Sequence, residues 1–256
     1  MLHRQHANDI WGWTDPQDSH EYAIVGLSSG ISFVRVTDAT TPEVLGFLPS
    51  TNNHTSGWRD MKVVNNAVYI VADSIVDHGL QVFDLARLRG LKPANPIRMF
   101  QPDFHYKEFG RAHNIVENQD TQTVFVVGAK SPNYSNNCRG GLHMVDTSEP
   151  LKPKFAGCYA DGGYVHDAEC LIYHGPDKEH QGKEICFCYN GYNGLTVVDV
   201  TERSNPVWIS STLYPGLKYT HQVRTRVQKL ESSFSLNLYF TYSLCTIQMF
   251  TKSYQS

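Results

Sequence analysis

"GLTVVDVTERSNPVW", residues 194–208, decides the fold because the chain repeats it. The stretch consists of a glycine, a short apolar run, an aspartate, several polar residues, and then Asn-Pro followed by an aromatic residue. Related stretches begin at Gly30, Gly79 and Gly141, with a spacing of about 50 to 60 residues. A repeat of this length indicates a propeller or a solenoid rather than a single sandwich.

Each copy of the repeat predicts four strands. Two apolar runs precede the glycine, as in "MKVVNNAVYIVAD" (residues 61–73), and they are typical of a hairpin with a short polar turn. The glycine then opens a third strand, and Pro42, Pro153 or Pro206 begins a fourth, where an edge strand tolerates the missing N–H. In the second copy the Asn-Pro comes late, at Pro96, after an insertion.

These units predict an all-β chain, and specifically a β-propeller of four-stranded antiparallel blades. A solenoid of parallel coils would not need the hairpins inside each unit. Four blades and the start of a fifth fit into the repeats, so we expect an incomplete propeller, cut from a ring of roughly six to eight blades.

Composition and charge restrict the partners. The chain has 256 residues, of which 41% are hydrophobic and 18% charged, as is ordinary for a globular protein. A net charge of −3 gives no basic field of the kind that phosphate backbones require, so nucleic acid is not expected as a partner. The first residues, "MLHRQHANDIWGW", contain no apolar segment typical of a secretory signal.

A polar pair stands at the head of the first strand of every unit. The second member is always a carboxylate or a carboxamide. Equivalent positions on the innermost strands of a propeller converge at one end of the central channel, so we expect these pairs to form a ring. The pairs are Asn8-Asp9, Arg59-Asp60, His113-Asn114, His166-Asp167 and His221-Gln222.

Two main interpretations of this ring remain open. In the first, the acidic and amide side chains at Asp9, Asp60, Asn114 and Asp167 accept hydrogen bonds from N–H groups at strand ends and in neighbouring blades. In the second, the channel mouth binds a polar ligand or a divalent metal, with His113, His166 and His221 together with Asp167, or with Asp60 or Glu169, as ligands. A mouth that binds an anion or a peptide is a further alternative.

The cysteines and sequons bear on the compartment. If "AECLIY" and "EICFCY" are adjacent antiparallel strands, Cys170 lies about opposite Cys186, close enough for a disulfide, and Cys138 and Cys158 could bridge the ends of one hairpin. Free thiols in the core are the alternative. Glycosylation sequons occur in turn-like stretches at Asn53 and Asn133, although the pattern also arises by chance.

The chain resembles the choice-of-anchor B family, whose members carry LVIVD-type repeats. The resemblance covers about residues 8–222 and rests on a series of motifs in the expected order: "NDIWGWTDP", "YAIVGLSSGISFVRVTD", "SGWRDMKV", "HGLQVFDL", "RAHNIVEN", "RGGLHMVD", "YVHDAECLIYHGPD", "KEICFCYNGYNGLTVVDVT" and "YTHQ". It implies a secreted or cell-surface β-propeller, and therefore disulfides between Cys138 and Cys158 and between Cys170 and Cys186. The resemblance implies a role in surface interaction or adhesion, and it does not imply that the protein catalyses a reaction.

Two segments are expected: a partial LVIVD-type propeller over 8–222 and a divergent tail over 223–256. The tail lacks glycine, proline and the Val-Asp pattern, and codons CAG-GTA-AGA for residues 222–224 would match a splice donor, so intron read-through is our hypothesis. Its apolar run "FSLNLYFTYSLCTIQMF" is shorter than the roughly twenty apolar residues of a membrane helix, and no span is expected.

The sequence favours an extracellular or cell-surface protein that acts as a non-catalytic interaction or adhesion scaffold and binds a protein, a glycan or a small polar ligand. The alternative is a metal-dependent hydrolase or oxidoreductase with a histidine-rich site at the channel mouth, because fold alone does not exclude chemistry. An intracellular propeller for protein assembly is a third hypothesis; it requires free thiols.

Overall fold

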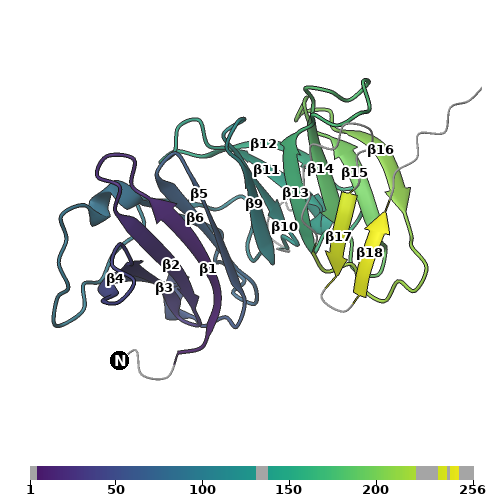
Figure 1. Ribbon diagram of the computed structural model, residues 1–256. Coiled ribbons are helices and arrows are strands. Elements are labelled where there is room, and N and C mark those ends of the chain that lie inside the picture. Colours follow the sequence, from purple (N-terminus) through teal and green to yellow (C-terminus); the bar gives the residue numbers. More distant parts are fainter. Residues whose placement is uncertain (1–4, 131–137, 223–235, 241–242, 248–256) are drawn as a thin grey trace, which may run out of the picture.

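In the computed structural model, the structure describes residues 5–130 and 138–222, together with two strands at 236–240 and 243–247. The described residues form four antiparallel sheets of four strands each and contain no α-helix (Figure 1). Within each sheet the strands are hydrogen-bonded in the order in which they occur in the chain. The four-stranded units expected from the repeat are therefore confirmed.

Every repeat supplies one sheet. The first sheet contains β1 (Ala7–Thr14), β2 (Glu21–Leu27), β3 (Gly30–Arg35) and β4 (Glu43–Pro49). The second contains β5 (Arg59–Val64), β6 (Ala67–Ala72), β7 (Leu80–Asp84) and β8 (Phe104–Tyr106). The third contains β9 (Asn114–Asn118), β10 (Thr123–Val127), β11 (Leu142–Asp146) and β12 (Lys154–Tyr159). The fourth contains β13 (Asp167–Ile172), β14 (Glu184–Tyr189), β15 (Leu195–Asp199) and β16 (Val207–Thr212).

The tail contributes a separate hairpin. Strands β17 (Leu236–Phe240) and β18 (Ser243–Ile247) pair antiparallel with each other. The other residues of the tail lie outside the described part of the chain. That the tail is read-through sequence stays a hypothesis.

The four repeat glycines occupy equivalent places at the start of the third strands β3, β7, β11 and β15. At each of them, an added Cβ would lie closer than 3.0 Å to a carbonyl oxygen of the fourth strand in the same sheet. These oxygens belong to Leu48, Tyr106, Tyr159 and Thr212. A side chain at the glycine would therefore push the third and fourth strands apart, which explains why the repeat begins with glycine.

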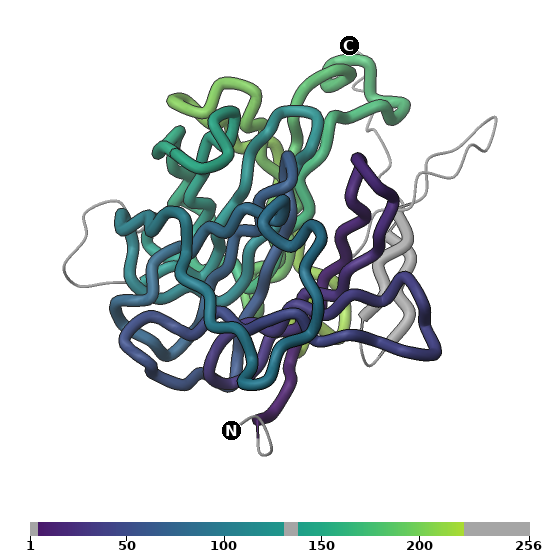
Figure 2. Tube along the Cα trace, turned by 90° about the vertical axis from the view of Figure 1, so that its left-hand side faces the viewer, coloured from purple at the N-terminus to yellow at the C-terminus, as the bar shows by residue number. Residues whose placement is uncertain are grey.

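Apolar side chains pack between successive sheets. One cluster joins the first and second sheets, where the rings of Phe33 and Phe83 stack with centroids 4.6 Å apart. Two further clusters join the second sheet to the third and the third to the fourth. The first strands β1, β5, β9 and β13 contact one another in this order. The sheets thus follow one another as a series, with the green sheets behind the purple and blue ones in Figure 2, and within the described residues this series does not close into a ring.

The second sheet departs from the repeat. Its fourth strand begins at Phe104 and not at Pro96, because the inserted residues leave the sheet and reach the outer edge of the first one. There the N–H of Phe47 donates to the carbonyl of Arg98 at 2.8 Å, and the N–H of Phe100 donates to the carbonyl of Phe47 at 2.8 Å. The insertion therefore covers part of the open edge of β4, whose backbone groups would otherwise lack strand partners.

Four cysteines form two disulfides, Cys138–Cys158 and Cys170–Cys186. Cys170 and Cys186 are direct partners in the register of β13 and β14, as the hairpin predicted. The interpretation of these four residues as free thiols is wrong. Cys188 is a buried free thiol.

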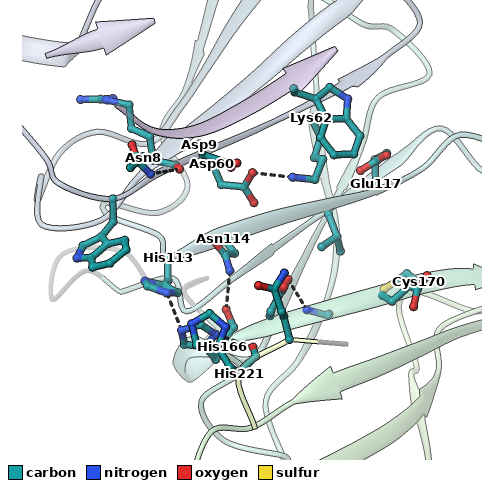
Figure 3. A pocket seen from close by; sticks show the side chains of 18 of the residues that line it. Asn8, Asp9, Asp60, Lys62, His113, Asn114, Glu117, His166, Cys170 and His221 are labelled. Carbon is teal, nitrogen blue, oxygen red and sulfur yellow. Dashed lines mark hydrogen bonds and ion pairs between the residues drawn. The ribbon is translucent and has the colours of Figure 1, made fainter. Parts of the chain in front are cut away.

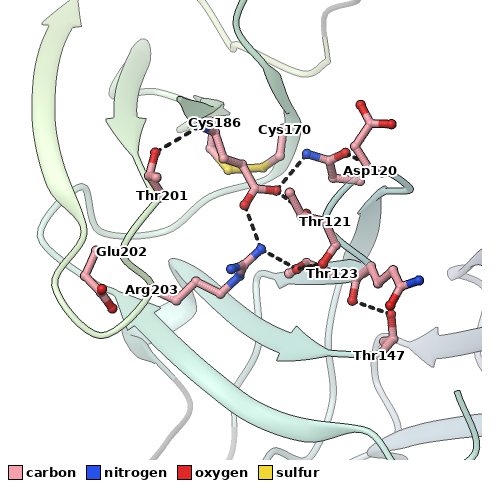
Figure 4. Close-up of polar contacts among 12 residues, drawn as sticks. Asp120, Thr121, Thr123, Thr147, Cys170, Cys186, Thr201, Glu202 and Arg203 are labelled. Atoms are coloured by element: carbon pink, nitrogen blue, oxygen red, sulfur yellow. Dashed lines mark hydrogen bonds and ion pairs between the residues drawn. A yellow bond between two sulfur atoms is a disulfide. The ribbon is translucent and has the colours of Figure 1, made fainter. Parts of the chain in front are cut away.

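A buried carboxylate ties the third sheet to the fourth (Figure 4). Glu184, only 2% exposed, accepts hydrogen bonds from Asn118 Nδ2 at 2.7 Å and from Thr121 Oγ1 at 2.6 Å. The guanidinium of Arg203 pairs with the same carboxylate at 2.7 Å and donates to Thr123 Oγ1 at 2.6 Å. Because its charge is compensated on several sides, this carboxylate can remain buried between the sheets.

The glycine constraint can be tested with Gly141→Ala. Gly141 needs no left-handed backbone, so the effect reports only the close approach to Tyr159. We expect the free energy of unfolding in urea to fall by about 2 to 3 kcal/mol, since the two strands must separate. Gly12→Ala is the matched control, because an added Cβ at Gly12 meets nothing within 4 Å. Equal stabilities for the two variants would contradict the constraint.

Candidate functional site

All five polar pairs line one pocket of about 460 Å³ (Figure 3). Asn8-Asp9 lies in β1 and Arg59-Asp60 opens β5. His113 stands immediately before β9 and His166 immediately before β13, whereas His221 lies in the segment that follows β16. The structure therefore brings together every residue that the sequence placed in the ring. Their role as ligand-binding residues stays a prediction.

Several of these side chains hold neighbouring sheets together. Asp60 Oδ2 accepts the N–H of Ile115 from the next sheet at 3.0 Å. Asn8 Nδ2 donates to the carbonyl of Arg59 at 2.8 Å, and Asn114 Nδ2 donates to the carbonyl of His166 at 3.2 Å. The contact of Asp60 is of the kind that the first interpretation describes, whereas Asn8 and Asn114 bridge the sheets by donating to carbonyls.

Arg59 performs the same task from a buried position. Its guanidinium donates to the carbonyls of Leu27 at 2.7 Å and Ser28 at 3.3 Å, which belong to the first sheet and the loop after β2. It also lies 3.1 Å from Nε2 of the buried His78. Burial lowers the pKa of Arg59 to about 10, and burial together with the Arg59 charge lowers the pKa of His78 to about 3. His78 is therefore a neutral acceptor for the guanidinium.

One side of the pocket is acidic. Burial and then the neighbouring Asp60 raise the pKa of Asp9 to about 7, and the same two causes raise the pKa of Asp167 to about 7. Lys62 lies 2.6 Å from Asp60 Oδ1 and 4.4 Å from the centroid of the Trp11 ring. Burial lowers the pKa of Lys62, but the surrounding carboxylates, Asp60 foremost, outweigh it, so the pKa is raised. Lys62 thus lies near three carboxyl groups, Asp9, Asp60 and Asp167, and two of them, Asp9 and Asp167, are costly to ionise.

The three histidines form a row on the opposite side of the pocket (Figure 3). Their ring centroids are 4.3 Å apart, both between His113 and His166 and between His166 and His221. Nδ1 of His166 lies 2.8 Å from the carbonyl oxygen of His221, which can only accept, so this nitrogen carries a proton. Burial and then the nearby His113 lower the pKa of His166 to about 4, which leaves its Nε2 as an acceptor at neutral pH.

Both ring nitrogens of His113 have hydrogen-bond partners. Its Nε2 lies 2.8 Å from Nε2 of His166 and must donate to it. Its Nδ1 lies 3.0 Å from Oδ2 of Asp73, a carboxylate that also only accepts and whose pKa is lowered, first of all by this hydrogen bond. His113 thus bridges Asp73 of the preceding sheet and His166 of the following one.

The metal assignment stays a prediction. No three ligand atoms from His113, His166, His221 and Asp167 lie within 4.8 Å of one another. Within the described ranges, the structure gathers only one set of three to this distance, Asp177, Glu179 and His180, in the turn between β13 and β14.

The sequons have different outcomes. Asn53 is exposed in a 3₁₀ turn, residues 51–53, so its side chain is accessible, and its glycosylation remains a prediction. Asn133 lies outside the described residues.

The sequence analysis missed a second group of residues, next to the histidine row. Arg111, Tyr164 and Tyr219 each stand two positions before a histidine of the row and line a second pocket of about 420 Å³. Their equivalent spacing was a usable signal, but it lies outside the apolar runs and the polar pairs that define the repeat.

Replacing Asp167 with asparagine tests the acidic side. A carboxyl whose pKa is raised in the fold contributes stability below its unfolded pKa of about 3.8 and loses it as the pH rises through about 7. Asp167→Asn is therefore expected to gain stability between about pH 4 and pH 7, reaching about 1 to 2 kcal/mol after allowance for partial exposure. Urea denaturation at several pH values measures the gain.

The exposed Asp161 provides the control, since Asp161→Asn removes a carboxylate outside the pocket. A gain that is independent of pH, or equal for both variants, would contradict the raised pKa of Asp167.

Within the described residues, no helix is long and apolar enough to cross a membrane. Comparison of the chain with protein-family models and with curated protein sequences finds no match. The similarity to choice-of-anchor B proteins therefore remains an expectation that rests on the motifs alone.

Proposed function

We propose that this chain is an arc of a β-propeller and acts as a non-catalytic interaction scaffold at the cell surface or outside the cell. The fourth sheet supports the propeller. Its residues Cys170 and Val198 pack in the cluster shared with the third sheet, whereas Ile185 and Val197 belong to a separate apolar cluster on the opposite face. Burial on both faces is what a blade inside a propeller requires.

The observation that carries the proposed function is the single pocket into which four first strands project their polar heads. These heads are largely engaged in bonds that fix one sheet against the next, as at Asp60 and Ile115. Such bonds make the pocket rigid, and a rigid polar concavity suits recognition, because little ordering is needed on binding.

An exposed indole at the rim adds a contact of the type found in binding hot spots. Trp58 is 61% exposed and lines the pocket, with its ring centroid 6.3 Å from that of His113. Large aromatic side chains of this kind contribute much of the affinity in many interfaces.

The two disulfides support an extracellular location, because oxidising compartments are where such bonds persist. Resemblance to a family of surface proteins points the same way. A protein or a glycan at a cell surface is accordingly the partner that we propose.

Trp58→Ala tests the scaffold. The full-length chain is applied to an array of glycans and extracellular-matrix proteins, and the apparent Kd of each bound species is measured. We expect Trp58→Ala to weaken binding by about tenfold or more, as for a hot-spot aromatic residue. Trp208→Ala is the control, because Trp208 is similarly exposed, at 56%, on the outermost strand β16. No binding by the parent chain, or equal loss in both variants, would contradict the proposal.

A metal-dependent hydrolase or oxidoreductase is the second candidate. The observation in its favour is that Nε2 of His113 and Nε2 of His166 face each other at 2.8 Å in a pocket that also contains two carboxyls with raised pKa values. Perturbed groups of this kind cluster at functional sites.

Metal analysis separates the two candidates. The full-length chain is incubated with Zn²⁺, Cu²⁺ or Fe²⁺, dialysed, and analysed by elemental mass spectrometry. For a scaffold we expect no stoichiometric metal. One ion per chain that is lost in both His113→Ala and His166→Ala, but retained in His105→Ala, would instead establish the metal site. His105 is outside the pocket.

A further inference from the structure

The second pocket lies beside the histidine row, where the second strands of three successive sheets end. Asp73, Gly128 and Asn190 follow β6, β10 and β14 directly, and all three line it. Its volume of about 420 Å³ is within the range of small-ligand sites. Asp73 of this pocket forms a hydrogen bond with His113 of the first pocket, so the two pockets adjoin at the histidine row.

Tyrosine rings form much of its wall, and glycines hold two of them in place. An added Cβ at Gly191 would lie 2.9 Å from the ring of Tyr219, and one at Gly128 would lie 3.2 Å from the ring of Tyr164. Both rings are therefore seated directly on backbone. The third ring, Tyr192, is 77% exposed and meets Tyr219 edge to face, with centroids 4.9 Å apart.

The tyrosine hydroxyls are also ordered. The hydroxyls of Tyr164 and Tyr219 interact with each other, and burial, followed by nearby charges and this interaction, raises the pKa of Tyr164. At the pocket wall, Asn190 donates through Nδ2 to the carbonyls of Gly162 and Tyr164, while its Oδ1 has no partner among the described residues. A donor group that reaches this oxygen would satisfy a buried acceptor.

The charges in the pocket favour an anion. Arg111 is 41% exposed, and its ion pair with Asp73 is long, at 3.9 Å. The Asp73 carboxylate is closer to His113, at 3.0 Å, and to the N–H of Ser74, at 2.7 Å. Lys130 places its ammonium 5.2 Å from the centroid of the Tyr164 ring. Two cations thus line the pocket, and its single carboxylate is already shared among three donors.

We propose that this second pocket binds a saccharide that carries a carboxylate group. Tyrosine faces suit the apolar faces of sugar rings, the ordered hydroxyls and Asn190 suit sugar hydroxyls, and Arg111 with Lys130 suits the carboxylate. A cationic ligand would be repelled by the same two side chains. A purely apolar ligand would make no ionic contact with the guanidinium or the ammonium.

The test compares a tetrasaccharide of uronic acids with its carboxyl-reduced neutral counterpart, using isothermal titration calorimetry on the full-length chain. The acidic form should bind at least about tenfold more tightly, because only it can pair with the guanidinium. Arg111→Gln should abolish this difference. Tyr192→Ala should weaken both sugars by about tenfold.

The control variants are Trp58→Ala, at the first pocket, and Trp208→Ala, on the outermost strand, and both should bind the acidic tetrasaccharide as the parent does. Tyr192 and Arg111 are exposed enough for folding to survive their substitution, which thermal melts of the variants verify. Failure of this inference is thereby distinguishable from failure of the scaffold proposal, which depends on Trp58.

Three results would overturn the inference. They are equal affinity for the two sugars, inorganic phosphate binding as tightly as the acidic tetrasaccharide, and an unchanged affinity in Tyr192→Ala. The second result would assign the pocket to simple anions.

Discussion

The close approach of two backbones at the start of each third strand is the constraint on which the architecture depends. No side chain fits at Gly30, Gly79, Gly141 or Gly194, because the carbonyl of the fourth strand occupies the place of a Cβ. In three of the sheets a bulge follows at the same distance from the glycine, at Phe33/Val34, Met144/Val145 and Val197/Val198. The sheets therefore have matching shapes, and sheets of matching shape can pack face to face in series.

This regularity is what makes the polar heads meet. The sheets are alike and follow one another in order. One pocket is therefore lined by the first residues of all four first strands, β1, β5, β9 and β13. The heads then differ in what they do. Asp60 and Asn114 bridge to the backbone of the next sheet, whereas Asp9 and Asp167 each accept the N–H of the following residue on their own strand. The two carboxyls with raised pKa values thus both bond to the backbone of their own strand.

The repeat predicted the parts of the fold that are periodic. A glycine, an apolar run and a proline at fixed spacing were sufficient for the strand order, for the hairpin that opposes Cys170 to Cys186, and for the convergence of the polar pairs. The insertion of the second unit was not predictable in the same way. Its backbone pairs with Phe47 of another sheet, and no local pattern encodes a hydrogen bond to a distant open edge.

The second pocket escaped sequence analysis for a related reason. It combines residues before the first strands, such as Tyr164, with residues after the second strands, such as Asn190, and these are adjacent only once the sheets are stacked. The contacts of His113 have the same origin, since Asp73 comes from the sheet before it and His166 from the sheet after it. A cluster of side chains contributed by three sheets can be identified only once the arrangement of the sheets is known.

The histidine row couples the two pockets through a short chain of hydrogen bonds. Asp73 lines the second pocket and holds Nδ1 of His113, and His113 in turn donates to His166 in the first pocket. The Asp73 carboxylate lies 3.0 Å from Nδ1 of His113 and 3.9 Å from the guanidinium of Arg111. Side chains from successive sheets therefore form one chain of contacts that runs from the second pocket to the first, from Asp73 through His113 to His166.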